Sequence, residues 1–231
     1  MKRVLYFLLL LPFVAAQTQT TAEVEITAEP EHHLVLENEF VRVFKVEVPP
    51  GAVTLLHRHR HDYVFVTLGN AHVSNQVEGK PAVDVTLTDG EARFVPGNFA
   101  HVARNLSEQP FRNVTIELMQ DEKLRVAPSG WPEENREKTF PGGHSRIVSV
   151  KDGVRVSEVD LDPGAVVPSH HHDGPHLLIA VTGLDLRSEV QGQGPASGKF
   201  KIGDVIWIPG GDTHTITNIG KDAAIFVTVE F

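Results

Sequence analysis

The sequence contains an internal repeat whose two copies keep a nearly constant spacing of 113 residues. The anchor pairs of the repeat are Val41–Val43 with Val154–Val156, Pro50–Val53 with Pro163–Val166, His57 with His170, His59 with His172, Gly90 with Gly203, Pro96 with Pro209, His101 with His214, Asn105 with Asn218, and Glu117 with Glu230. The spacing slips only once, by one residue, between Gly69 and Gly183. A register kept this long does not arise by chance, so the sequence predicts two copies of one structural unit.

The repeat sets the predicted domain boundaries. One domain covers residues 31–118 and the other covers residues 144–231. Residues 119–143 between them are predicted to be a linker, because most of this segment is rich in proline, glycine and serine.

The amino terminus has the pattern of a secretory signal peptide. Lys2 and Arg3 precede an uncharged apolar run that ends at Ala16, and small side chains before Gln17 suit cleavage there. The run is shorter than the roughly 20 apolar residues that a membrane-spanning helix needs. We therefore expect a periplasmic or extracellular protein without a membrane span, in which residues 1–16 are removed and residues 17–30 form a mobile leader.

Within each copy the sequence predicts short β-strands separated by turns, and no long helix. Residues with β-branched and aromatic side chains gather in runs bounded by Pro-Gly, Asp-Gly and Gly-Asn pairs. The expected strands are 41–48, 63–68, 83–87, 92–95 and 114–118 in the first copy, and 154–161, 177–182, 205–208 and 225–231 in the second. Many short antiparallel strands in a unit of this size are typical of a jelly roll. The predicted fold class is therefore all-β, with two tandem jelly-roll β-barrels.

The composition excludes several classes of protein. The chain has no cysteine, which excludes disulfides, thiolate metal sites and a cysteine nucleophile. Its formal net charge of -9 argues against nucleic-acid binding, which requires a basic face. Histidine occurs 13 times, against 2 tyrosines and 2 tryptophans. Because histidine is the commonest metal ligand, the positions of these histidines are the first functional question.

The second copy places four histidines at a spacing that predicts a metal site. His170 and His172 are two residues apart, so on a strand both project to the same face. His176 follows a tight turn, and His214 comes just after the Pro-Gly-Gly turn of a later strand. Closure of the strands into a barrel would bring these four imidazoles together around one divalent metal, with positions open for water, O₂ or substrate. His171 is expected to point to the opposite face.

The first copy keeps three of these histidines, His57, His59 and His101. At the fourth position its loop is one residue shorter, and counting back from the following glycine places Asp62 there. Asp62 would complete a site of three histidines and one carboxylate, with His61 as the alternative ligand. A further interpretation is that Asp62 only caps the turn and that this site is incomplete.

These runs resemble the two motifs of the cupin superfamily, G(X)5HXH(X)3–4E(X)6G and G(X)5PXG(X)2H(X)3N. The resemblance covers nearly all of the chain after the amino-terminal segment and implies a bicupin with two cupin-type barrels. The metal ligands of the family fall on His170, His172, His176 and His214 in the second copy, and on His57, His59, Asp62 and His101 in the first. The family's glutamate is replaced at both sites, and the glycine of the second motif is Asn98 in the first copy. With His176 in place of that glutamate, the second site resembles the four-histidine cupins. These departures argue against a close relationship with oxalate decarboxylases or oxalate oxidases.

The resemblance implies a fold more strongly than a function, because one fold supports many chemistries. We expect an exported, metal-dependent oxidoreductase of the dioxygenase type that acts on a small organic substrate. The alternative is a non-catalytic protein that binds metal or a small ligand, since no acid–base pair is evident beyond the ligands. The expected cofactor is a divalent transition metal: Mn, Fe, Zn, Cu or Ni. The expected partner is a small molecule and not a nucleic acid, and a homo-oligomer is compatible with the sequence.

The two sites are expected to be unequal. Four neutral imidazoles leave a divalent metal its full charge of +2, whereas ligation by Asp62 would reduce the charge of the first site to +1. A higher positive charge makes a stronger Lewis acid and holds an anionic substrate more tightly. We therefore expect the second copy to be the stronger metal site and to carry the chemistry.

Overall fold

The computed structural model describes residues 22–120, 131 and 136–231. The predicted signal peptide and residues 17–21 of the predicted leader lie outside the described residues. In the described part of the chain, the only helical element is the short 3-10 helix η1 (Ile26–Ala28). None of the described helices is long and apolar enough to span a membrane.

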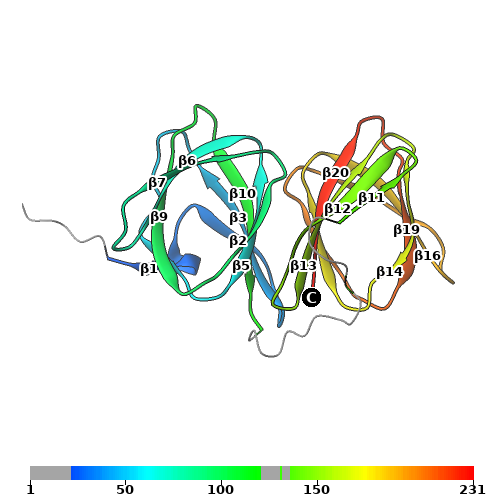
Figure 1. The fold of residues 1–231 in the computed structure, drawn as a ribbon, viewed down its shortest axis with the longest axis horizontal. Helices are drawn as coiled ribbons and strands as arrows, with labels where there is room; N and C mark the ends of the chain where they lie inside the picture. Colours follow the sequence, from blue (N-terminus) through cyan, green and yellow to red (C-terminus); the bar gives the residue numbers. More distant parts are fainter. Residues whose placement is uncertain (1–21, 121–130, 132–135) are drawn as a thin grey trace, which may run out of the picture.

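The amino-terminal half forms two five-stranded sheets that curve around one interior (Figure 1). Its strands are β1 (Val24–Glu25), β2 (His32–Glu37), β3 (Val41–Val48), β4 (His57–His59), β5 (Tyr63–Leu68), β6 (Ala71–Val77), β7 (Val83–Leu87), β8 (Ala92–Val95), β9 (Phe99–Asn105) and β10 (Phe111–Leu118). One sheet has the order β1-β4-β9-β6-β7 and the other has the order β2-β3-β10-β5-β8.

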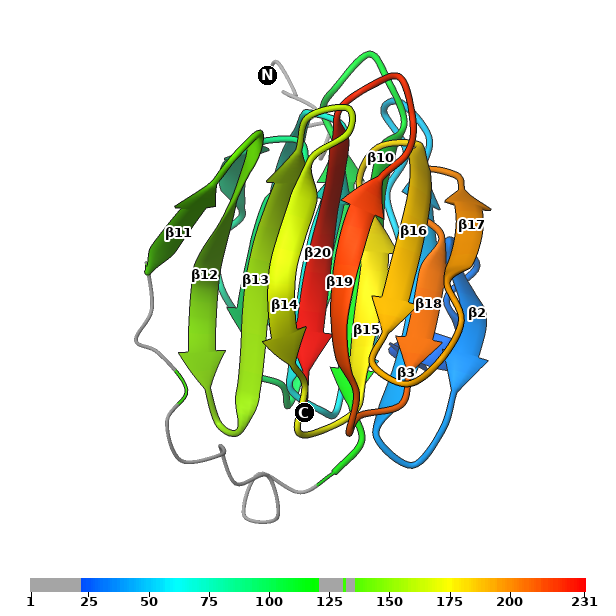
Figure 2. The same ribbon diagram turned by 90° about the vertical axis from the view of Figure 1, so that its right-hand side faces the viewer.

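The carboxyl-terminal half also forms two sheets, which are seen most directly in Figure 2. Its strands are β11 (Glu137–Phe140), β12 (Gly143–Lys151), β13 (Val154–Leu161), β14 (Val166–His171), β15 (His176–Ala180), β16 (Leu184–Val190), β17 (Ala196–Phe200), β18 (Val205–Ile208), β19 (Thr213–Asn218) and β20 (Ala224–Glu230). The orders are β11-β12-β13-β20-β15-β18 and β14-β19-β16-β17. The chain is therefore all-β and forms two jelly-roll barrels, as predicted.

The structure differs from the predicted segments at two places. The leader was expected to be mobile through residue 30, but Val24 pairs with His57 in a parallel bridge, and Ile26 and Glu29 are buried. Strand β11 lies inside the predicted linker and pairs with β12. Both segments are polar in composition. Backbone pairing holds them together with a few apolar contacts, such as those of the buried Ile26 and the partly buried Phe140, and an average over composition does not reveal these contacts.

A hydrophobic cluster joins the two barrels. Outward-facing residues of β3, β5 and β10, among them Val64 and Val114, pack in one cluster with outward-facing residues of β13, β15 and β20, among them Leu177 and Val227. Figure 1 shows these strands side by side at the junction. Alternate residues of the same strands point into the barrels, so both faces of these strands are buried.

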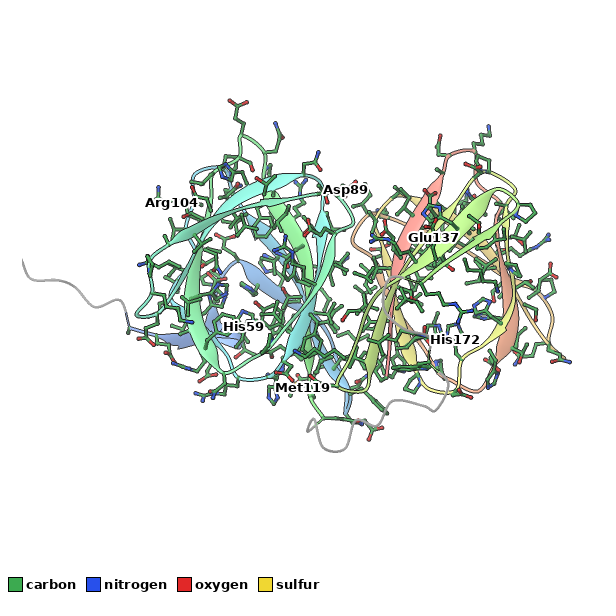
Figure 3. The ribbon with its side chains drawn as sticks, in the orientation of Figure 1. His59, Asp89, Arg104, Met119, Glu137 and His172 are labelled. Atoms are coloured by element: carbon green, nitrogen blue, oxygen red, sulfur yellow. The ribbon has the colours of Figure 1, made fainter. Side chains whose placement is uncertain are left out.

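The inward-facing positions hold the predicted ligands beside apolar side chains. Tyr63 and His176, the first residues of β5 and β15, line the two barrel interiors, while the residues that follow them belong to the shared cluster. Figure 3 shows His59 inside one barrel and His172 inside the other. The predicted ligands therefore face two separate interiors.

Candidate metal centres

The carboxyl-terminal barrel brings three predicted ligands together. The side-chain nitrogens of His170, His172 and His214 include a set that lies within 4.8 Å of one another. His170 stands opposite His214 in the antiparallel pair of β14 and β19, and their Nε2 atoms are 3.0 Å apart. Two ligands bound to one metal at about 2.0–2.1 Å are separated by about 3.0–3.4 Å, so this spacing fits a shared ion.

Two of these imidazoles are oriented by hydrogen bonds to residues outside the cluster. The Nδ1 of His170 donates to the carbonyl oxygen of Pro168 at 2.8 Å, and the Nδ1 of His172 lies 3.1 Å from a carboxylate oxygen of Glu230. A carbonyl or carboxylate oxygen only accepts, so the proton sits on Nδ1 and the Nε2 lone pair is left for a ligand. Metal-binding histidines are usually oriented in this way.

His176 lies next to the three-histidine cluster. Its ring stacks on His172 with centroids 3.9 Å apart, and its Nδ1 is buried without a hydrogen-bond partner. A buried nitrogen without a partner costs about 1–3 kcal/mol. The place of His176 in a four-histidine ligand set stays a prediction.

The amino-terminal barrel assembles its predicted histidines in the same way. His57 stands opposite His101 in the pair of β4 and β9, and the Nε2 atoms of His59 and His101 are 3.2 Å apart. The Nδ1 of His57 donates to the Leu55 carbonyl at 2.9 Å, and the Nδ1 of His101 lies 2.6 Å from Asn75 Oδ1. The Nε2 of His57 is buried without a hydrogen-bond partner, which fits an atom that binds metal.

Asp62, the residue predicted at the fourth position of this site, forms a backbone contact, and its place in the ligand set stays a prediction. A carboxylate oxygen of Asp62 accepts a hydrogen bond from the backbone N–H of Gly97 at 2.8 Å. Among the described residues of this barrel, the group with mutually close ligand atoms consists of His32, His57 and His59, and it includes neither Asp62 nor His101. His32 comes from β2, well before the first motif, and no spacing rule pointed to it.

Burial favours the neutral form of His57, His101, His176 and His214. Desolvation, followed by repulsion from neighbouring imidazoles, lowers the pKa of His57 to about 4 and that of His101 to about 3. The same causes lower the pKa of His214 to about 4 and that of His176 to about 3. Neutral imidazole is the form that binds metal, so both clusters are ready to bind at neutral and mildly acidic pH.

We expect the metal-free protein to lose stability as the pH falls from about 6.5 towards 4. In the unfolded chain these histidines protonate near pH 6.5, whereas the buried imidazoles stay neutral until lower pH. The unfolded state therefore binds more protons in this window, and stability falls with pH. Each unit of pKa difference corresponds to about 1.4 kcal/mol, so several histidines give a loss of several kcal/mol.

Urea denaturation in the presence of a chelator measures this effect. The unfolding midpoint should be clearly lower at about pH 5 than at about pH 7.5, and most of the loss should fall below pH 6.5. Equal midpoints would show that the imidazoles are not held neutral by burial.

A buried glutamate lies beside each histidine cluster: Glu230 in the carboxyl-terminal barrel and Glu117 in the amino-terminal barrel. In the carboxyl-terminal barrel, Glu230 contacts Arg155 at 2.5 and 3.1 Å as well as His172. Burial alone would raise its pKa, but the hydrogen bonds from His172 and Arg155 outweigh burial and lower the pKa to about 2. Glu230 is therefore an anion that pairs with Arg155 and orients His172.

The equivalent carboxylate of the other barrel is held loosely. Glu117 lies 4.0 Å from His59 Nδ1 and 3.5 Å from the guanidinium of Arg42, which bonds more closely to Glu37. Burial raises the pKa of Glu117 to about 7. The two barrels thus carry the same arginine, glutamate and histidine, but only Glu230 forms short contacts with both partners.

The two clusters open into different cavities. The carboxyl-terminal cavity has a volume of about 520 Å³, and its charged lining residues are Arg136, Lys138 and Arg155 together with Glu137 and Glu230. The amino-terminal cavity is smaller, at about 210 Å³, and valine, leucine and phenylalanine side chains form much of its wall. The cavities therefore favour different ligands.

Comparison with known proteins agrees with this architecture. Residues 157–230 match the cupin domain family. One solved structure of oxalate decarboxylase from Bacillus subtilis, from work on its Mn(II) centres, has a TM-score of 0.63 at 15% identity and covers 87% of this chain and 75% of that chain. Another, determined at pH 4.6, has a TM-score of 0.62 at 15% identity and covers 83% and 68%. No curated protein matches the sequence.

These matches show the fold and cover part of the candidate sites. At 15% identity, the likeness to the decarboxylase structures shows the fold and not the reaction. The cupin match covers Glu230 and all four predicted ligands of that half. The described structure is therefore an all-β chain of two jelly-roll barrels, of which the carboxyl-terminal one matches the cupin domain family, and each barrel has a cluster of histidines that suits a metal.

Proposed function

We propose that the protein is a metal-dependent enzyme that carries out a dioxygenase-like oxidation of a small organic substrate, with its reaction centre in the carboxyl-terminal barrel. The predicted ligands there are His170, His172, His176 and His214. In the amino-terminal barrel they are His57, His59, His101 and Asp62. Imidazole ligands suit zinc, copper, iron and nickel, and an added carboxylate also suits manganese.

The observation that carries this proposal is the cavity beside the carboxyl-terminal cluster. Its volume of about 520 Å³ is within the range of small-molecule sites, and His170 and His172 line it. Lys138 and Arg136 outweigh the single negative charge of Glu137 between them on the wall, which favours a substrate with a carboxylate or another anionic group. Phe140 and Phe226 supply an apolar surface that limits the access of water.

A bound metal would supply Lewis acidity and open coordination positions. The chain itself supplies the orientation: Glu230 and the Pro168 carbonyl fix two imidazoles, and Lys138 and Arg136 are placed to hold an anionic group. Fixed ligands and a partly apolar wall reduce the reorganisation needed during reaction.

Oxygen uptake tests the proposal. Purified protein is stripped with a chelator, reloaded separately with Fe²⁺, Cu²⁺, Mn²⁺, Ni²⁺ or Zn²⁺, and offered catechols, diketones and flavonoids. Metal-dependent oxygen consumption together with loss of substrate is expected for at least one pair of metal and substrate. Zinc, which has no redox chemistry, serves as the matched negative control. Substrate binding without consumption under any metal would contradict an oxidative function.

A second candidate is a non-catalytic binding protein. The observation that favours it is Glu230, which is locked between Arg155 and His172 and has a pKa of about 2, so it is a poor proton donor. Such a protein would bind an anionic ligand in the carboxyl-terminal cavity and release it unchanged. Calorimetric binding of a ligand that is recovered intact would favour this function.

We also propose that the protein is exported. The support is the basic start and the apolar run of residues 1–16. Intact-mass analysis of protein from its native source should give a chain that begins at or near Gln17. A mass that includes Met1 would contradict export by cleavage.

A further inference from the structure

We propose that His32 is the fourth ligand of the amino-terminal metal site, and that the two barrels recruit their fourth imidazole from different strands. The inference rests on the metal binding proposed above. It replaces Asp62 in the predicted ligand set with a histidine from β2. The ion implied is a divalent transition metal that accepts imidazole ligands.

The geometry places His32 inside the cluster. Its ring centroid lies 4.7 Å from that of His57, and the three ligand nitrogens of His32, His57 and His59 lie within 4.8 Å of one another. The His32 side chain is only 5% exposed. The buried Nε2 of His57, which has no hydrogen-bond partner, belongs to the same cluster.

Glu29 holds His32 in the orientation of a ligand. A carboxylate oxygen of Glu29 lies 2.6 Å from His32 Nδ1, and the Glu29 side chain is 1% exposed. The same carboxylate accepts hydrogen bonds from the backbone N–H groups of Leu55 and Glu31, at 3.1 and 2.8 Å. The carboxylate is therefore fixed, the proton of His32 sits on Nδ1, and Nε2 is left for the metal. Buried carboxylate–histidine pairs of this kind are typical partners of a metal ligand.

The repeat shows that the fourth ligand has changed place. With the spacing of 113 residues, His176 corresponds to Tyr63 and His32 corresponds to Ser145. Tyr63 stacks on His59 at 4.2 Å and 19°, just as His176 stacks on His172 at 3.9 Å and 20°. Tyr63 thus occupies the position of a ligand without offering an imidazole.

In the carboxyl-terminal half, a serine takes the place of His32. Ser145, on β12, lines the carboxyl-terminal cavity at the position that His32 takes in the amino-terminal barrel. Each barrel therefore has four imidazoles, of which three are equivalent and one is not. Because the fourth ligand would approach from a different strand, the open positions of the two bound metals would face different walls. The charge difference expected from Asp62 then disappears, and the sites differ in geometry instead.

The test isolates the amino-terminal site. The parent variant carries His170→Ala and His172→Ala in the full chain, so that only this site binds metal, and Zn²⁺ affinity is measured by competition with a chromogenic chelator. His32→Ser introduces the residue of the other half. We expect it to weaken Zn²⁺ binding by more than the 10- to 100-fold that loss of an outer-shell partner costs. The control is His33→Ala, which removes the exposed neighbouring histidine and should leave the affinity unchanged.

A second measurement needs no change at position 32. X-ray absorption of the Zn²⁺-loaded parent variant should count four imidazoles, and three or fewer would overturn the inference. Equal Zn²⁺ affinity with serine at position 32 would also overturn it, while the proposed metal site stands. A parent variant that stays folded but binds no Zn²⁺ would instead overturn the amino-terminal metal site as a whole.

Discussion

Replacing His170 and His172 together by alanine is expected to abolish metal binding in the carboxyl-terminal barrel and to reduce oxygen-consuming turnover at least ~10³-fold. The two residues supply two ligands from a single strand, and their nitrogens lie within 4.8 Å of each other and of His214. No other described residue of the cluster would restore a set of three ligands with the observed spacing. Metal content is measured by elemental analysis, and turnover by oxygen uptake.

The matched control is the double variant His57→Ala with His59→Ala. It removes the equivalent ligands of the amino-terminal barrel and should leave most of the turnover intact, because the larger cavity lies in the other half. Circular dichroism must show that both variants are folded. Turnover that survives in the first variant and is lost in the second would place the reaction in the amino-terminal barrel.

Replacing Glu230 by glutamine should weaken metal binding in the carboxyl-terminal barrel by about 10- to 100-fold, because His172 loses the anion that orients it. The same change should lower the free energy of unfolding by about 3–5 kcal/mol, since it leaves Arg155 largely buried without its anionic partner. Chelator competition gives the affinity, and urea denaturation gives the stability.

Glu117→Gln is the control for this prediction. Glu117 occupies the equivalent position, but Arg42 has a closer partner in Glu37, and burial already disfavours the ionised form of Glu117. We therefore expect a small or even stabilising effect on unfolding at neutral pH. Equal destabilisation by the two changes would show that the short contacts around Glu230 carry no special energy.

The sequence correctly predicted the bounds of strands whose two faces are both buried, one inside a barrel and the other between the barrels. Strands β3, β5 and β13 begin and end where the runs of β-branched residues do, because their outward residues fill the cluster between the barrels. Strands β14 and β19 were not predicted, although they carry the histidine positions. The buried positions of β19 hold His214, Ile216 and Asn218, and no residue of β14 is fully buried, so no apolar alternation marks these strands.

The candidate sites were predictable from the sequence where the two motifs themselves supply the ligands. His57 and His101 meet because β4 and β9 pair in register, and the two motifs encode these strands. His32 and Glu29 were missed because they reach the cluster from the other sheet and from η1, and only the closed barrel brings them to β4. Contacts between sheets depend on closure and leave no local spacing in the sequence.

The cluster between the barrels makes the two halves one cooperative unit. Separating them would expose the outward residues of β3, β10, β13 and β20 to water, and it would break the ion pair between Lys45 and Asp204 at 3.1 Å. Heating should therefore give a single calorimetric transition. An ion bound in either barrel raises the melting temperature of the whole chain, because binding to the native state stabilises everything that unfolds with it. A metal site without catalytic activity would in this way still raise the thermal stability of the catalytic site.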